Sequence, residues 1–304
     1  MTRAAIIVAI ALCTLVVACA GQGALPAADA GIAAAGPLPA VPADETVPLR
    51  APGLPADAAS AAGRLAASPR HAEWAMVPVG DGDSIRTWVV YPERSTPAPV
   101  VLVVHEIFGL TAWIRAVADQ LAADGFIAIA PDLMTAHDLP VGPEGDPLRE
   151  QATAAIRTLD PAVYQEQLRA IGAWGTALPA AAGTYGIVGF CWGGTASFTH
   201  AVMSSDVGAA VVYYGSSPAT DRLQRIEAPV LGLYAGDDAR VNATVPPADE
   251  EMRRLGKSYE VHMFDGAGHG FLRQQDGREG ANMAATRGAW PLTVSFFRRH
   301  LDGG

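Results

Sequence analysis

Gly189-Phe190-Cys191-Trp192-Gly193 stands between the apolar run Tyr185-Gly186-Ile187-Val188 and the segment Gly194-Thr195-Ala196-Ser197-Phe198. The apolar run predicts a buried strand, and the later segment predicts the start of a helix. A sharp strand-to-helix turn needs glycines beside the turning residue, because that residue's backbone is strained and its neighbours pack closely. The stretch therefore has the form of a nucleophile elbow, with cysteine where serine is usual. On this motif alone, a buried structural cysteine is the alternative.

Strands alternate with helices along the rest of the chain. This alternation predicts an α/β fold, an open and mostly parallel sheet with helices on both faces. Active sites in such sheets lie at the carboxyl ends of strands, which is where Cys191 stands. The predicted strands are 86–91, 100–105, 126–130, 185–190, 209–214, 229–234 and 259–264, and the predicted helices are 113–124, 148–159, 162–177, 195–203, 247–255 and 282–300.

The first residues of the chain predict an export signal. Residues 4–18 carry no charge and follow Arg3, and the run is too short for an ordinary membrane span. It ends in Val16-Val17-Ala18-Cys19, which resembles the bacterial lipobox. We therefore expect residues 1–18 to be a signal peptide and Cys19 to be the acylated N-terminus, anchored to a membrane of the cell envelope. An ordinary secretory signal, leaving a soluble periplasmic or secreted protein, is the alternative.

Cysteine usage follows from this expectation. The chain has three cysteines, of which Cys13 would leave with the signal and Cys19 would carry lipid. Cys191 would then be the one thiol of the exported protein, and an internal disulfide would be excluded. A lone thiol in an oxidising compartment favours a working nucleophile.

The remaining chain divides by composition. Residues 20–71 are rich in alanine and proline, lack aromatic residues and predict a flexible linker. Residues 72–304 are long enough for one catalytic domain with a large core. The formal net charge of −10 argues against a nucleic-acid partner.

An acid and a histidine follow Cys191 in the order that an elbow nucleophile requires. Asp237 and Asp238 come directly after the predicted strand 229–234, and His269 comes directly after 259–264. Asp238 is the favoured acid because Val241 stands three residues beyond it, completing a Gly-x-Asp-x-x-Val pattern. No spacing of His, Cys, Asp and Glu predicts a metal, and no glycine-rich phosphate loop predicts a cofactor.

These motifs match more than a general hydrolase. From about residue 74 to 302 the chain resembles the dienelactone hydrolase family, α/β-hydrolases with a Cys-Asp-His triad, through 189–194 (Gly-Phe-Cys-Trp-Gly-Gly), 106–109 (Glu-Ile-Phe-Gly) and 131–133 (Pro-Asp-Leu). The resemblance implies a triad of Cys191, Asp238 and His269. It also implies that Glu106 lies beside the cysteine and helps to form the thiolate when substrate arrives.

The chemistry agrees with that implication. A free thiol is mostly protonated at neutral pH, and a fixed carboxylate beside a thiolate would repel it. Glu106 therefore has a role only if it moves or accepts a proton; otherwise it is a capping or loop carboxylate. The oxyanion hole would be the backbone N–H groups of Ile107 and Trp192.

The resemblance also implies a substrate class. Its arginines in Arg-Glu-Gln-Ala and four residues beyond the histidine correspond to Arg149 and Arg273, and Tyr213 corresponds to a pocket tyrosine. Two converging guanidinium groups suit a carboxylate better than a neutral ester, whereas two surface arginines are the alternative.

The sequence thus predicts a hydrolase that cleaves a small ester or lactone, dienelactone-like and bearing a carboxylate, through an acyl-enzyme. A promiscuous carboxylesterase or thioesterase is the first alternative, and a non-catalytic envelope binding protein on the same fold is the second. The export signal and linker depart from the cytoplasmic members of the family.

Overall fold

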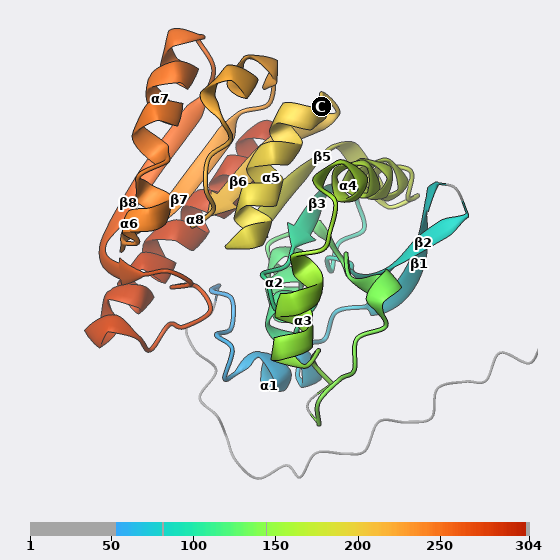
Figure 1. Cartoon of the computed structure of the whole chain (residues 1–304). Coiled ribbons are helices and arrows are strands. Elements are labelled where there is room, and N and C mark those ends of the chain that lie inside the picture. Colours follow the sequence, from blue (N-terminus) through green and yellow to red (C-terminus); the bar gives the residue numbers. More distant parts are fainter. Residues whose placement is uncertain (1–52, 81, 144, 302–304) are drawn as a thin grey trace, which may run out of the picture. The chain divides into compact units, whose positions relative to one another are not determined.

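The computed structural model describes residues 53–301 except 81 and 144 (Figure 1). These residues form one eight-stranded sheet in the order β1-β2-β4-β3-β5-β6-β7-β8. The β1–β2 and β2–β4 pairs are antiparallel, and every other pair is parallel. The strands are β1 Ala72–Gly80, β2 Asp83–Val90, β3 Ala98–Val104, β4 Ile127–Pro131, β5 Ala181–Phe190, β6 Val207–Tyr213, β7 Val230–Asp237 and β8 Tyr259–Gly268.

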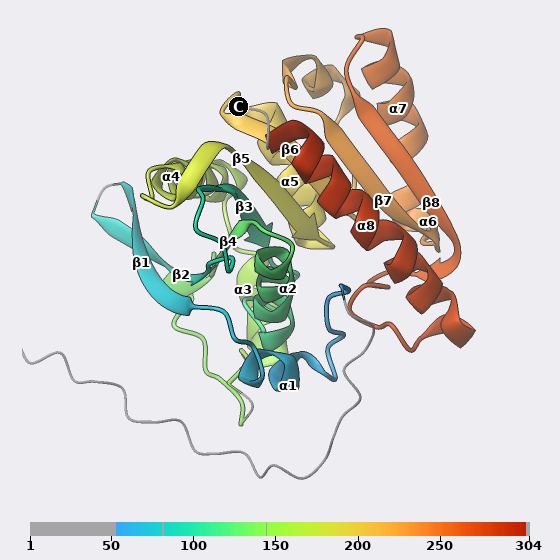
Figure 2. The same cartoon turned by 180° about the vertical axis from the view of Figure 1, so that it is seen from behind.

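Helices cover both faces of this sheet. One face packs against α2 (Ala112–Ala123) and α8 (Ala281–Leu301), and the other packs against α4 (Pro161–Thr176), α5 (Trp192–Met203) and α7 (Val245–Arg254). Figure 2 shows α2 and α8 in front, and Figure 1 shows the opposite face. The predicted α/β architecture is therefore confirmed. The remaining helices are α1 Ala61–Ala66, α3 Arg149–Ile156 and α6 Ala239–Asn242, with short 3₁₀ turns at Thr135–His137, Thr220–Arg225 and Arg278–Gly280.

Buried strands were the easiest to predict. All seven residues of β3 are buried, so that strand is a continuous apolar run in the sequence, as central parallel strands are. The strand β1 was missed because it lies at the sheet edge, where Val77 is its one fully buried residue and Pro78 interrupts the pattern. The strand β8 continues beyond the predicted Phe264 to Gly268, which brings its end up to His269.

The predicted linker 20–71 is wrong for the part that the structure describes. Leu54, Ala56, Asp57 and Ala61 are buried, and α1 lies against α2 (Figures 1 and 2). The prediction failed because alanine and proline are common both in flexible spacers and in short packed segments. The rest of that linker, the signal peptide 1–18 and Cys19 lie outside the described residues.

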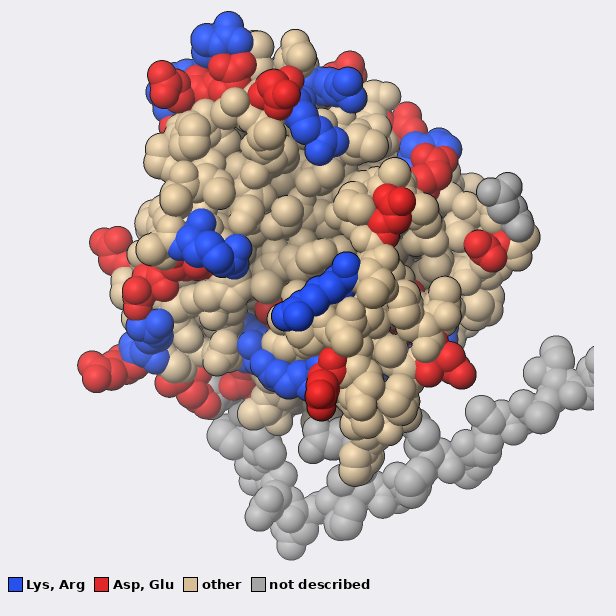
Figure 3. Space-filling model, viewed as in Figure 1, with Lys and Arg blue, Asp and Glu red and all other residues tan. Residues whose placement is uncertain are grey.

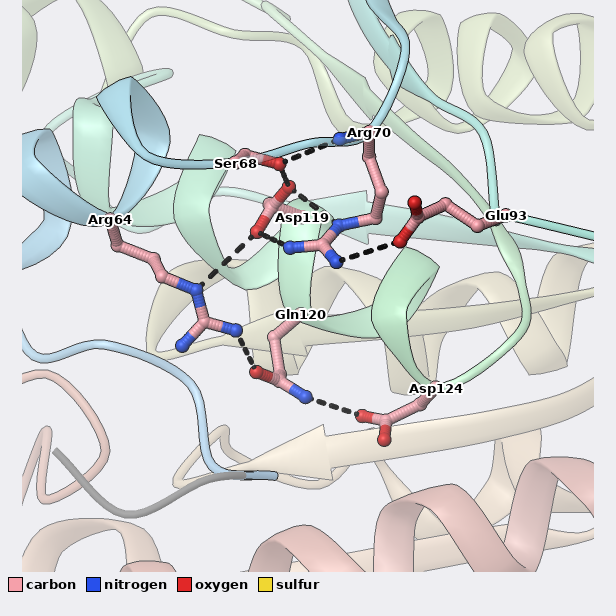
Figure 4. Close-up of polar contacts among 7 residues, drawn as sticks. All are labelled: Arg64, Ser68, Arg70, Glu93, Asp119, Gln120 and Asp124. Carbon is pink, nitrogen blue, oxygen red and sulfur yellow. Dashed lines mark hydrogen bonds and ion pairs between the residues drawn. The ribbon is translucent and has the colours of Figure 1, made fainter. Parts of the chain in front are cut away.

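A buried carboxylate fastens this segment to α2 (Figure 4). Arg70 Nε and Nη2 lie 2.8 and 2.6 Å from the two oxygens of Asp119, whose side chain is 2% exposed. Ser68 donates to the same carboxylate, and Arg64 Nε lies 3.6 Å from it. A buried charge with several donors is tolerated, whereas the same charge left alone would be costly. Residues 61–70 are therefore packed against the domain as part of its folded structure.

Charges on the face shown in Figure 3 are mixed: separate basic side chains lie across its middle, acidic and basic side chains both occur at its rim, and uncharged surface separates them, so that no continuous basic surface forms there. This agrees with the formal net charge of −10. Within the described residues, no helix has the length and apolar character needed to span a bilayer.

Candidate active site

The turn that carries Cys191 is held by close backbone packing. Cys191 has φ 56° and ψ −114°, a conformation that is costly for a residue with a side chain. A Cβ on Gly189 would lie 1.8 Å from the Gly193 carbonyl oxygen, and one on Gly193 would lie 2.4 Å from the Val104 oxygen. A Cβ on Gly194 would lie 2.5 Å from the oxygen of Tyr213. Only glycine fits these positions, so the chain can turn within one residue and present Cys191 at the carboxyl edge of the sheet.

Cys191 is half-buried and is the one cysteine among the described residues. Burial, and after it the neighbouring Glu106 carboxylate, raise the pKa of the Cys191 thiol to about 11. The Trp192 N–H, Arg240 and Arg273 oppose this effect. The resting side chain is therefore a neutral thiol at neutral pH, and forming the nucleophile requires a change in its surroundings.

The structure brings Asp238 and His269 together. Asp238 follows β7 and His269 follows β8, and Nδ1 of His269 lies 2.5 Å from Oδ2 of Asp238. The Asp238 side chain is 8% exposed, and its second oxygen accepts the N–H of Val241 at 3.4 Å. This arrangement leaves Nε2 of His269 free for a substrate or nucleophile. Asp237 instead forms an exposed ion pair with Arg278.

The Cys191 thiol and His269 are not joined in this structure: among the described residues, no hydrogen bond connects them. The group whose charge acts on Cys191 most strongly is Glu106. Asp238 and His269 thus form a hydrogen-bonded pair, whereas Cys191 is separate from this pair and is influenced by the Glu106 carboxylate.

Glu106 is itself held between a cation and the apolar interior. Its side chain is 4% exposed, and its Oε2 lies 2.7 Å from Nε of Arg273. That N–H makes no well-directed hydrogen bond, so charge rather than hydrogen-bond geometry holds the pair. Burial raises the pKa of Glu106 from its ordinary 4.5 to about 7, although Arg273 and Arg149 lower it. Glu106 can therefore exchange a proton near neutral pH.

Both predicted arginines meet on one aromatic ring. The guanidinium carbon of Arg149 lies 3.7 Å from the centroid of the Phe108 ring, and that of Arg273 lies 5.2 Å from it. No ion pair of Arg149 occurs among the described residues. Beside the ring is a cavity of about 180 Å³, lined by Ala58, Phe108, Thr111, Trp113, Asp146, Pro147, Arg149 and Arg273. Two guanidinium groups at one cavity can receive a carboxylate.

The backbone donors predicted for the oxyanion hole make no hydrogen bond to another backbone group among the described residues. Trp192 is the first residue of α5, so its N–H has no acceptor within the helix, and it instead acts on the Cys191 thiol, whose pKa it lowers. The N–H of Ile107 makes none of the turn and loop hydrogen bonds of the described residues. Both groups can donate to an oxyanion that develops beside the sulfur.

Tyr213, predicted to line the pocket, is instead a core residue. Its side chain is fully buried, and its hydroxyl lies 2.7 Å from Thr293 Oγ1 in α8. Neighbouring residues at a strand end point in different directions, and it is Tyr214 that lies at the site. Tyr214 has φ 38°, its ring lies 5.1 Å from the His269 ring, and its buried hydroxyl has no partner among the described residues. Burial raises the pKa of Tyr214 well above its ordinary value, so the group remains an O–H donor.

His105 was also missed by sequence reasoning. Leu133 N–H donates to its Nε2 at 3.3 Å, so Nδ1 carries the proton and donates to the Glu106 carbonyl at 2.8 Å. The ring also stacks on Trp192, with centroids 5.8 Å apart. His105 thus joins the loops that carry Ile107 and Trp192. Its position directly before Glu106 was the available signal.

Within the described residues, no group of three or more His, Cys, Asp and Glu side chains is arranged to hold a metal ion.

Comparisons with known proteins agree with this fold. The model of the dienelactone hydrolase family matches residues 85–301. A carboxymethylenebutenolidase of Pseudomonas putida is 30% identical over 209 residues, covering 67% of this chain and 88% of that protein. A Saccharolobus solfataricus protein, provisionally named a carboxymethylenebutenolidase, is 30% identical over 251 residues, covering 72% of this chain and 95% of that protein. The crystal structure of a provisionally named dienelactone hydrolase from Klebsiella pneumoniae superposes with a TM-score of 0.66 at 25% identity, covering 76% of this chain and 99% of that one.

The pKa of Glu106 predicts a pH-dependent stability. The folded protein holds the proton of Glu106 more tightly than the unfolded chain does. The stability that this proton contributes is therefore complete below about pH 4.5 and is lost as pH rises through about 7. Glu106→Gln stays neutral, so its free energy of unfolding relative to the wild type should rise between pH 5 and 8.5 by on the order of 1–3 kcal/mol. Urea unfolding at both pH values measures this, with exposed Glu227→Gln as the control. A difference that is the same at both pH values would contradict the assignment.

Proposed function

The chain belongs to the dienelactone hydrolase family and is a carboxylic ester hydrolase, and from this premise we propose that it cleaves a small carboxylate-bearing ester or lactone through Cys191, His269 and Asp238. The observation that supports the proposal most directly is the Asp238–His269 pair, 2.5 Å apart, at the same edge of the sheet as the Cys191 elbow. A nucleophile, a histidine and an acid that orients the histidine are the parts that acyl transfer needs.

Forming the thiolate is the first proposed step. A substrate carboxylate that binds Arg273 competes with Glu106 for that cation. Glu106 then loses a charge that lowered its pKa, becomes a stronger base and accepts the Cys191 proton. The proton passes on to His269, whose charged form is stabilised by Asp238. The thiolate would thereby form only when substrate is bound.

Acyl transfer follows. The Cys191 sulfur forms a bond to the carbonyl carbon, and the N–H groups of Ile107 and Trp192 stabilise the negative oxygen. The C–O bond of the ester then breaks, and His269 donates its proton to the departing oxygen. His269 next takes a proton from water, which attacks the thioester, and it returns that proton to the sulfur as the acid leaves. The balance is one ester and one water consumed, and one acid and one alcohol or enol formed.

The substrate class rests on Arg149 and Arg273. Their shared position on Phe108, beside an open cavity, places positive charge where one end of a bound molecule can reach it. A flat, conjugated acid can stack near the ring while its carboxylate contacts the guanidinium groups. A neutral ester would leave Arg149 without a partner.

The cellular location is part of the proposal. The charged Arg3, the uncharged run and Val16-Val17-Ala18-Cys19 support export, with Cys19 acylated and the enzyme tethered to a membrane of the cell envelope.

Substitutions at the triad test the reaction. With full-length protein, Cys191→Ala should abolish hydrolysis of both a carboxylate-bearing dienelactone and p-nitrophenyl acetate. Asp238→Asn should lower kcat at least about 100-fold, because it removes the group that orients His269. Asp237→Asn, at an exposed ion pair, should change kcat less than about twofold. Equal losses for both aspartate variants would refute the assignment.

The same assay separates the alternatives. Cysteine-dependent turnover of the acetate alone would indicate a promiscuous carboxylesterase or thioesterase. No turnover, together with a thiol that does not react with alkylating reagents, would indicate a binding protein on this fold.

The role of Arg149 is tested by selectivity. Arg149→Ala should lower the ratio of kcat/KM for the dienelactone to that for the acetate by roughly 10- to 100-fold, since a hydrogen bond to a charged group contributes about 1.5–3 kcal/mol. Arg157→Ala, at the far end of α3, is the matched control. If Arg149→Ala leaves this ratio of kcat/KM values unchanged, Arg149 does not bind the substrate carboxylate and is a surface charge.

Lipidation is tested in cells of the source organism. Radiolabelled palmitate should enter the wild-type protein, and Cys19→Ser should remove the label and move the protein to the soluble fraction. Label that persists in the variant would place the modification elsewhere.

A further inference from the structure

A short segment ahead of the sheet touches two loops of the active site. We call residues 54–60 the N-terminal strap; its first four residues are buried. The carbonyl of Pro55 accepts a hydrogen bond from Gln275 Nε2 at 2.9 Å, and the carbonyl of Ala56 accepts one from Trp113 Nε1 at 3.1 Å. The N–H of Ala58 donates to the carbonyl of Arg273 at 3.0 Å.

These contacts join two segments that line the arginine cavity. Gln275 and Arg273 belong to the loop that follows His269, and Trp113 lies in the first turn of α2, just after the loop that carries Glu106 and Phe108. The strap therefore contacts both of these segments and connects them. Because the family match covers residues 85–301, the strap is a feature of this chain beyond that match.

The strap leads into a segment that is fixed to α2. Ser60 donates from its backbone N–H to Asp57 at 2.9 Å, and α1 follows directly. Beyond α1, the Asp119 cluster in Figure 4 fixes Arg64, Ser68 and Arg70 to α2. A segment tied down in this way can act as a fixed wall.

Ala58 is the strap residue that reaches the arginine cavity. It lines the cavity together with Phe108, Arg149 and Arg273, whereas the next residue, Ala59, does not. Asp146 also lines this cavity, but its Oδ1 accepts the Ala112 N–H at 2.6 Å and lies 3.6 Å from Arg115. Its charge is therefore engaged outside the cavity, and Arg149 remains the unpaired charge within it.

We propose that the strap forms the outer wall of the substrate's carboxylate-binding cavity, and that the small side chain of Ala58 determines which acids fit beside Arg149 and Arg273. The inference rests on the proposed function, because it concerns the same site. A cavity of about 180 Å³ has room for a small conjugated acid, and a larger side chain at 58 would fill the space next to the guanidinium groups. Selectivity would thus be set by a segment outside the region that the family model matches.

Ala58→Leu and Ala59→Leu form the matched pair that tests this. Both positions are exposed, so leucine should be tolerated at either, and thermal unfolding confirms that both variants fold. Binding of sorbate, a flat conjugated carboxylate, is measured by calorimetry in the full-length chain carrying Cys191→Ala. We expect Ala58→Leu to raise the Kd at least tenfold, and Ala58→Gly and Ala59→Leu to change it less than twofold.

Turnover supplies the second readout. In the full-length chain with Cys191 intact, Ala58→Leu should lower the kcat/KM ratio of dienelactone to p-nitrophenyl acetate at least tenfold. Equal sorbate binding by Ala58→Leu and Ala59→Leu, or no binding by the parent, would overturn the proposal. Since the binding measurement needs no catalysis, a failure of the proposed reaction would show separately, as missing Cys191-dependent turnover beside normal sorbate binding.

Discussion

The backbone conformation of Cys191 is the constraint on which the site depends. A residue with a side chain at φ 56° costs about 1–3 kcal/mol, and it persists only where the surroundings impose it. Here they do, because Gly189, Gly193 and Gly194 let α5 approach the ends of β3 and β6 more closely than any side chain would permit. The same approach puts the thiol at the carboxyl edge of the sheet, next to the free N–H groups at the start of α5. Fold and nucleophile placement thus have one cause.

A second constraint is the burial of Glu106. Its carboxylate pairs with the Arg273 guanidinium and its charge acts on the Cys191 thiol, while burial disfavours the charge of the carboxylate and that of the thiolate together. Two adjacent negative charges repel each other, so the resting state keeps the sulfur protonated. A ligand anion that engages Arg273 changes the balance, which couples the chemistry of the sulfur to the recognition of substrate. Of the two neighbours that sequence reasoning missed, His105 donates a hydrogen bond to the Glu106 carbonyl, and Tyr214 packs its ring against that of His269.

The strap shows how a segment outside the family match becomes part of the site. Its contacts use backbone carbonyls and one N–H, which any sequence could offer, and side chains of Gln275 and Trp113 that belong to the domain. Such contacts leave no pattern in the strap's own residues. Alanine and proline there are compatible with close packing and equally with a free chain, and the side chains that decide between them, Gln275 and Trp113, lie elsewhere in the domain.

The sequence by itself determined the α/β architecture, the elbow and the order of Cys191, Asp238 and His269, because apolar runs and glycine spacing are local and report directly on strand, turn and strand end. The likeness of 106–109 to its family pattern also predicted Glu106 as a partner of Cys191, and the charge of Glu106 acts on that thiol. Only the tertiary structure decided that Arg273 pairs with Glu106, that Arg149 meets it on Phe108, that Tyr214 rather than Tyr213 faces His269, and that Ala58 lines the arginine cavity. Each of these depends on contacts between segments far apart in the chain, which no local pattern records.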